Sequence, residues 1–323
     1  MKKILKKMLV AVFALFIVLP LSAQSSQMIF VEGGTFQMGD ASQKDSPVHT
    51  VTVSNFDMSK YKVSLSEFGS ITGKWPINYQ NLVWHTPVPS SEYDSIPAFG
   101  VTWYEAIVYC NKRSVAEGLT PCYASNGSKA AVTNATNFDK DWQKSTGKLS
   151  LQNVTCDWNA DGYRLPREEE WELAARKTKN GLQRGDLASG QSEETASPLS
   201  LEECVAWIPS NSKGTRTVGT AGNPFMPEAM PAPGSGNPNF SGLFDMSGNV
   251  MEYCWDWMDS YKDVEDGSIA AGPEYGLQRV ARGGSFSSYT PFIYCGDRYS
   301  YDPNEVYNYM GFRICSSITG ENL

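Results

Sequence analysis

The chain has 323 residues, of which 41% are hydrophobic, 12% aromatic and 19% charged. This composition excludes a disordered tail protein, a coiled coil and a collagen-like chain, and the length allows one large domain or at most two. The formal net charge of −8 argues against a nucleic-acid partner, because phosphate binding needs a basic surface. The two histidines, His49 and His85, leave little room for a His-rich metal centre.

The first 23 residues have the layout of a secretory signal peptide. Basic residues 1–7 precede an apolar run of 12 residues, 8–19, and small residues end at Ala23. The run is shorter than the roughly 20 residues that a membrane span needs. The alternative is an anchor at the membrane surface. We expect the mature chain, residues 24–323, to be exported to the periplasm or the extracellular space without a transmembrane span.

Short strands are predicted first along the mature chain. Residues 28–38 indicate two strands around a Gly33-Gly34 turn, and residues 48–53 alternate as another strand. Long polar stretches over 120–160 and 178–240 are rich in Ser, Asn, Gly and Pro. Loops of this length favour a loop-rich α+β fold, and no linker divides the chain into two domains.

Three helices are predicted from their starting signals. Residues 64–67 and 102–105 have the sequence of a capping box, in which a Ser or Thr is followed three residues later by Glu. Pro166 opens the third helix at its first position, and residues 168–170 place three glutamates in its first turn. These glutamates fit a helix N-terminus, and a pair for acid/base catalysis is the alternative.

The seven cysteines form no Cys-x-x-Cys pair, so a zinc ribbon is not supported. In an exported protein they indicate disulfides with one thiol left over, and a catalytic or copper-binding thiolate is the alternative. They are Cys110, Cys122, Cys156, Cys204, Cys254, Cys295 and Cys315.

Five segments in one order resemble the formylglycine-generating enzyme (sulfatase-modifying factor) family. The resemblance covers about residues 28–316 and implies a single domain, 24–323, with a variant of the C-type lectin fold. The segments are Phe30–Gly39, Val101–Cys110, Gly162–Arg176, Gly242–Glu252 and the pair Arg282–Phe286 with Gly311–Arg313.

The resemblance also implies a copper oxidase. Enzymes of this family oxidise the cysteine of a sulfatase Cys-x-Pro-x-Arg motif to formylglycine, and they bind Cu(I) between two cysteines that follow a Gly-Gly-Ser. Here the first of these positions matches Ser288, or Ser287 with a shift, and Cys295 matches the second only if two extra residues are allowed. Soft thiolates select Cu(I) and a hydroxyl does not, so the pair is incomplete.

Three cysteine pairings are considered, and one of them is implied by the resemblance. Cys254 could supply the missing copper-binding thiol, but a Cys254–Cys295 disulfide is the favoured interpretation. The family implies a bond between Cys110 and Cys315. A Cys122–Cys156 disulfide could close the polar stretch between these two residues, which would leave Cys204 free.

A calcium site is predicted in the segment 245–252. Asp245 and Glu252 offer carboxylates, while Gly248 and Val250 offer backbone carbonyls, and oxygen ligands of both kinds suit Ca²⁺. The family has a calcium site at these four positions. Spacing alone would favour a solvated turn. A second family site, near residues 206–208, is not carried over because no carboxylate pattern is found there.

Two further groups of side chains have two interpretations each. The aromatic residues could line a face that binds sugar or peptide, or they could pack in the core and loops: Trp255, Trp257, Tyr289, Tyr294 and Tyr299. Arg298 and Arg313 could tie loops together or contact a ligand.

We expect an exported, calcium-stabilised member of this family that is not a competent copper oxidase. It would be a binding or accessory module for a peptide, a glycan or an envelope protein. The alternative is a divergent copper-dependent formylglycine-generating oxidase with Cys295 as one thiolate. A structural component of an envelope machine is a third interpretation.

Overall fold

The computed structural model describes most of the mature chain. The described residues are 27–41, 46–76, 95–125, 128–131, 154–191, 200, 202–222, 232–259, 261 and 276–318. The predicted signal peptide and His85 lie outside them. Within these ranges no helix has the length and apolar character needed to cross a bilayer.

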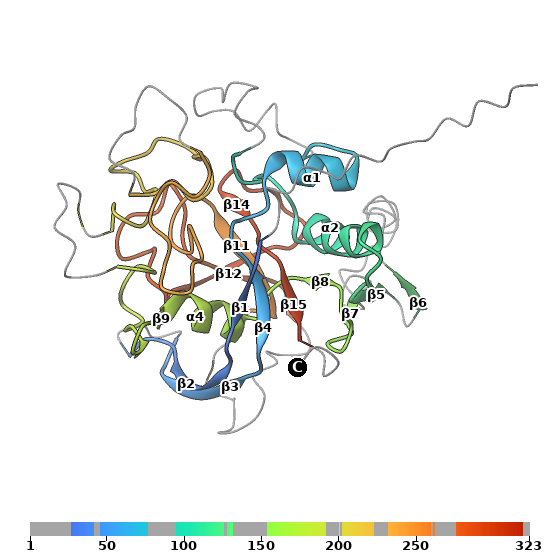
Figure 1. Ribbon diagram of the computed structural model, residues 1–323, viewed down its shortest axis with the longest axis horizontal. Helices are drawn as coiled ribbons and strands as arrows, with labels where there is room; N and C mark the ends of the chain where they lie inside the picture. Colours follow the sequence, from blue (N-terminus) through green and yellow to red (C-terminus); the bar gives the residue numbers. More distant parts are fainter. Residues whose placement is uncertain are drawn as a thin grey trace, which may run out of the picture.

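One four-stranded sheet joins the two ends of the domain. Its strand order is β1 (Met28–Val31), β4 (Phe56–Ser59), β15 (Cys315–Ser317) and β8 (Tyr163–Arg164), and all neighbours are antiparallel. Figure 1 shows β1, β4 and β15 side by side near the centre of the molecule. The last strand of the chain therefore closes the sheet that the first strand begins.

A second four-stranded sheet is formed by strands from the C-terminal part of the chain, between residues 251 and 311. Its order is β13 (Arg298–Tyr301), β12 (Arg279–Arg282), β11 (Met251–Trp257) and β14 (Met310–Gly311). All of β12 and most of β11 are buried. Strands 11 and 14 run parallel, whereas the other pairs are antiparallel.

Smaller strands complete the fold. β2 (Gly34–Met38) pairs with β3 (His49–Val53). Strands were predicted in 28–38 and 48–53, but their partners were not, and β1 pairs with β4. Gly33 is required before this hairpin, because a Cβ there would lie 2.1 Å from the Val53 carbonyl oxygen. The remaining strands are β5 (Tyr123–Ser125), β6 (Ser128–Ala131), β7 (Val154–Cys156), β9 (Lys177–Thr178) and β10 (Gly181–Leu182).

The helices α1 (Leu65–Thr72) and α2 (Trp103–Ala116) begin at the two predicted capping boxes. Ser64 and Thr102 accept from the backbone N–H of Glu67 and Glu105, and each glutamate accepts in return from the backbone of its cap residue. The two helices pack together, and α2 also packs on β8. Figure 1 shows them on one side of the sheets and α4 on the other.

The third helix, α4 (Glu168–Arg176), starts later than the sequence predicted. Arg167 is its N-cap, so Pro166 is not its first residue. The Pro166 carbonyl instead accepts the backbone N–H of Trp255 on β11 at 2.8 Å, which holds residue 166 against that sheet. α4 packs against both the β2–β3 hairpin and the β11–β12 pair.

Candidate functional site

The turn after β12 needs its two glycines. Gly283 and Gly284 have φ angles of 89° and 64°, which side chains rarely adopt. A Cβ on Gly283 would lie 2.4 Å from the Met246 carbonyl oxygen, and one on Gly284 would lie 2.4 Å from that of Phe292. The turn backbone therefore lies directly against residues 246 and 292.

Ser288, which the resemblance aligns with the first family cysteine unless Ser287 takes that position, is buried and hydrogen-bonded within the turn. Its Oγ accepts the backbone N–H of Ser285 at 3.0 Å and lies 3.3 Å from the Ser285 hydroxyl. The Ser288 backbone N–H donates to the Ser285 carbonyl at 2.9 Å. Ser287 is exposed, and its hydroxyl lies 2.9 Å from that of Ser285. The Ser288 hydroxyl thus closes a serine turn and provides no soft metal ligand.

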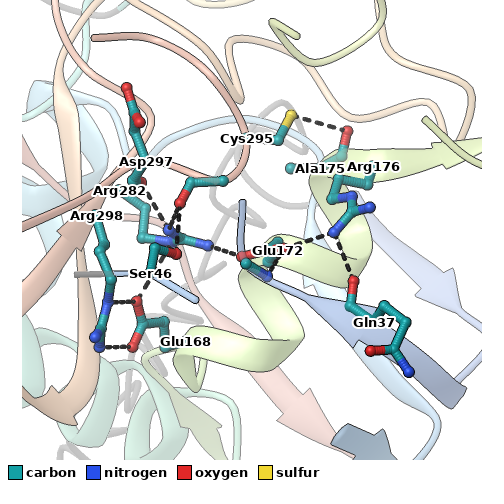
Figure 2. A network of polar contacts seen from close by, with 12 residues as sticks. Gln37, Ser46, Glu168, Glu172, Ala175, Arg176, Arg282, Cys295, Asp297 and Arg298 are labelled. Atoms are coloured by element: carbon teal, nitrogen blue, oxygen red, sulfur yellow. Dashed lines mark hydrogen bonds and ion pairs between the residues drawn. The ribbon is translucent and has the colours of Figure 1, made fainter. Parts of the chain in front are cut away.

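Cys295 lies in the core beside α4. The thiol is fully buried and directed at the Ala175 carbonyl oxygen, 3.7 Å away, as Figure 2 shows. Gln183 donates its side-chain amide to the sulfur at 3.5 Å. Burial raises the pKa of Cys295 to about 12, so the group stays a protonated thiol at neutral pH. No hydrogen bond among the described residues joins Cys295 to Ser288.

Cys254 does not supply a second thiolate either. It is fully buried on β11, and burial raises its pKa well above the ordinary value. Ser288, Cys295 and Cys254 therefore do not fit Cu(I), which needs thiolates with an open coordination position.

None of the three predicted disulfides is formed in the structure, because all seven cysteines carry free thiols. Their surroundings differ. Cys122 and Cys156 are hydrogen-bonded to each other beside the β5–β7 pair. Cys254 and Cys295 share a hydrophobic cluster with Cys315 without a bond between them.

The acidic residues of α4 form buried ion pairs that were not predicted from the sequence. Glu172 accepts Arg176 at 2.8 Å and also binds Arg282, whereas Glu168 binds Arg298 through both carboxylate oxygens (Figure 2). Only the i, i+4 spacing of Glu172 and Arg176 gave a local signal.

Glu170 also forms a buried ion pair. It accepts two hydrogen bonds of 2.7 Å from the Arg164 guanidinium. Glu168 and Glu170 are thus neutralised structural anions, which supports the helix-terminus interpretation over an acid/base pair. Arg298 ties α4 to the loop at Asp259, whose carbonyl it also binds at 2.6 Å.

The predicted calcium residues lie around a second buried ion pair. Asp245 and Asn249 have φ angles of 53° and 63°, so the segment wraps tightly. Asp245 accepts the Gly219 backbone N–H at 2.7 Å through Oδ2, while its buried Oδ1 has no hydrogen-bond partner among the described residues. Burial raises the pKa of Asp245.

Glu252 is fully buried and saturated with donors. Lys62 binds Oε1, Arg313 donates Nε–H to both oxygens at 2.9 and 2.7 Å, and Trp171 donates its indole N–H to Oε2 at 2.6 Å. Burial alone would raise its pKa, but the charges of Arg313 and Lys62 hold the pKa below its ordinary value. Calcium at these positions stays a prediction, and Glu252 fits it poorly because both of its oxygens are occupied.

No group of three or more His, Cys, Asp or Glu side chains is arranged to hold a metal ion in the part of the chain that the structure describes.

The predicted aromatic residues divide into two groups. Trp255 is partly buried against the core and stacks on Tyr123 at 5.3 Å, and Trp257 is buried and covers the Arg279 guanidinium at 3.4 Å. Tyr289, by contrast, is 69% exposed in the turn after Ser288, near Phe292, which is 53% exposed. Tyr294 and Tyr299 are partly buried beside them.

Comparisons with known proteins find relatives that match almost the whole chain. The chain is 28% identical over 308 residues to the chaperone protein LppX of Paenibacillus barcinonensis, covering 91% of this chain and 90% of that protein. It is also 28% identical over 305 residues to the formylglycine-generating enzyme of Thermomonospora curvata, covering 90% and 93%.

Among solved structures, the variable protein 1 of Treponema denticola aligns with a TM-score of 0.70 at 28% identity, over 90% of this chain and 95% of that chain. CarF aligns with a TM-score of 0.61 at 21% identity, over 91% and 98%, and shares the fold. The expected variant of the C-type lectin fold is thus confirmed. The family described as sulfatase-modifying factor enzyme 1-like matches residues 18–318. The chain therefore belongs to the sulfatase-modifying factor family, which includes the formylglycine-generating enzymes.

Proposed function

We propose that this chain is an exported, non-catalytic binding or accessory module of its family. One observation carries the proposal: the two positions that should bind copper hold a hydroxyl engaged in a turn and a thiol sealed in the core. Copper-dependent oxidation of a cysteine needs soft thiolates and an open position for oxygen and the substrate thiol. Ser288 lacks the softness, and Cys295 lacks both the ionisation and the access.

The exposed turn 289–292 supports a binding role. Tyr289 and Phe292 present two aromatic rings directly after Ser288, at the place where the family resemblance puts the active-site groove. The Tyr299 hydroxyl donates to the Phe292 carbonyl at 3.0 Å and fixes the turn. Rigid aromatic side chains contribute large contact area to interfaces with peptides, glycans and proteins. The relative named as a chaperone favours an accessory role of this kind.

A Cu(I) titration separates this proposal from the divergent oxidase. The mature protein and a Cys295→Ala variant are titrated against a competing Cu(I) chelator under reducing conditions. We expect both proteins to bind Cu(I) weakly and equally, because Cys295 is not an available ligand. Tight binding of one Cu(I) per chain that the variant loses would favour the oxidase.

The binding role is tested on peptide and glycan arrays with matched variants. Tyr289→Ala combined with Phe292→Ala removes the exposed rings, while Phe240→Ala removes a ring that is 62% exposed on another loop. We expect the double variant to lose at least tenfold in binding to any ligand found and the control to lose none. Equal binding by all three proteins would exclude this turn as the binding surface.

A further inference from the structure

Four buried charged residues form what we call the Lys62 cluster: Lys62, Asp245, Glu252 and Arg313. The side chains of Lys62, Glu252 and Arg313 are completely inaccessible to solvent, and Asp245 is 3% exposed. We propose that the Lys62 ammonium is a built-in cation that takes the place of the calcium ion implied by the family resemblance, so that this domain is independent of calcium.

The hydrogen bonds of Glu252 provide the first argument. An ionised carboxylate has about four lone-pair sites on its two oxygens. Oε1 accepts from Lys62 and Arg313, and Oε2 accepts from Arg313 and Trp171. A calcium ion at Glu252 would have to displace at least one of these donors, and each displaced donor would lose its partner in the protein interior.

Charge balance provides the second argument. Even with both Asp245 and Glu252 ionised, the positive charges of Lys62 and Arg313 already neutralise them. A divalent ion added to this set would leave two uncompensated positive charges away from water, which is strongly unfavourable. The cluster is therefore complete with the cations that the chain itself supplies.

The connections made by the cluster are those that a structural ion would make. Arg313 donates to the carbonyls of Ser59 at 2.9 Å and Phe244 at 2.7 Å. The Lys60 carbonyl accepts the Phe244 backbone N–H at 3.0 Å. Lys62 adds the bond from the segment after β4 to Glu252 on β11, 190 residues away in the sequence. Three segments distant in sequence thus meet at one point.

Thermal unfolding with and without calcium tests the proposal on the mature protein. We expect the Tm of the unaltered protein to be the same in EGTA and in millimolar Ca²⁺, and its metal content to be below one calcium per chain. Lys62→Ala removes the ammonium and leaves space beside Asp245 and Glu252. We expect this variant to have a lower Tm that rises by several degrees when Ca²⁺ is added.

Lys60→Ala is the matched control, because Lys60 is a neighbouring lysine that stacks on the Tyr61 and Phe244 rings at the surface. It should show no response to calcium. One calcium per chain in the unaltered protein, with a Tm that falls in EGTA, would overturn the proposal. A Lys62→Ala variant that is destabilised without responding to calcium would also overturn it. If that variant does not fold, the metal content and EGTA response of the unaltered protein decide.

Discussion

Asp256 is a buried carboxyl group that forms no ion pair with another described residue. Its Oδ2 accepts the backbone N–H of Glu168, the first residue of α4, at 2.6 Å. Burial and, to a smaller degree, the nearby charge of Glu168 raise the pKa of Asp256 to about 7. The neighbouring Glu169 also has a raised pKa, from burial and then from the charge of Asp256. The start of α4 therefore holds protons that the unfolded chain would release.

These protons give stability a defined pH dependence. Between about pH 4 and pH 7 the folded protein keeps Asp256 protonated while the unfolded chain ionises it, so stability falls as pH rises. An Asp256→Asn variant keeps an oxygen acceptor and loses the titration. We expect its stability relative to the unaltered protein to increase across this window by on the order of 2–4 kcal/mol, since one pKa unit is worth about 1.4 kcal/mol. Urea unfolding at several pH values measures the unfolding free energy of both proteins. A difference between the two that does not change with pH would contradict the prediction.

A substitution at Glu172 tests how much the buried ion pairs of α4 contribute to stability. It is fully buried between Arg176 and Arg282 and also accepts the Gly39 backbone N–H at 2.8 Å. Glu172→Gln removes the carboxylate that pairs with Arg176 and leaves Arg282 with the more distant Glu168 carboxylate, 3.7 Å from its Nε, so we expect a loss of about 3–5 kcal/mol in unfolding free energy. Asp186→Asn breaks the exposed pair with Arg184 and should cost less than about 1 kcal/mol. Similar losses of unfolding free energy in the two variants would show that burial does not strengthen the Glu172 ion pairs.

Local sequence signals explain the starts of the elements better than their partners. The capping boxes at Ser64 and Thr102 are complete within four residues, which is why α1 and α2 could be predicted. The prediction that Pro166 is the first residue of α4 was wrong. The Pro166 carbonyl accepts a hydrogen bond from Trp255 on a distant strand instead of one within the helix. Strand pairing such as that of β15 with β4 joins residues far apart in sequence and leaves no local signal.

The β5–β7 pair offers a disulfide that an oxidising compartment would form. Cys122 and Cys156 are already hydrogen-bonded neighbours there. We expect air-oxidised protein to retain five of its seven thiols, with a Cys122–Cys156 linkage in a non-reducing peptide map. Closing a loop of roughly 35 residues should stabilise the fold by about 3–4 kcal/mol over the reduced form. Cys204→Ala should keep this linkage and Cys122→Ser should lose it; seven free thiols after oxidation would exclude the bond.

Ion pairs between residues far apart in the sequence hold the domain together, and no local sequence pattern predicts them. Lys62 meets Glu252, and Arg282 meets Glu172, across 190 and 110 residues. The resemblance located the fold and the altered copper positions, because those rest on short segments in a fixed order. It did not reveal that Glu252 carries a buried ion pair, since the partner residue lies in another element. The family can be identified from these short segments, whereas the proposed loss of the copper site rests on the burial of Cys295 and the hydrogen bonds of Ser288.

The most direct test of a non-catalytic domain is turnover of a family substrate. Mature protein is incubated with a Cys-x-Pro-x-Arg peptide, Cu(I), oxygen and a thiol reductant, and the peptide is analysed by mass spectrometry. A Cys295→Ala variant and a formylglycine-generating enzyme serve as controls. We predict that the peptide keeps its mass with this protein and its variant, while the control enzyme converts it. Conversion of the thiol to the aldehyde by the unaltered protein, abolished in Cys295→Ala, would contradict the proposed loss of catalysis and establish a divergent oxidase.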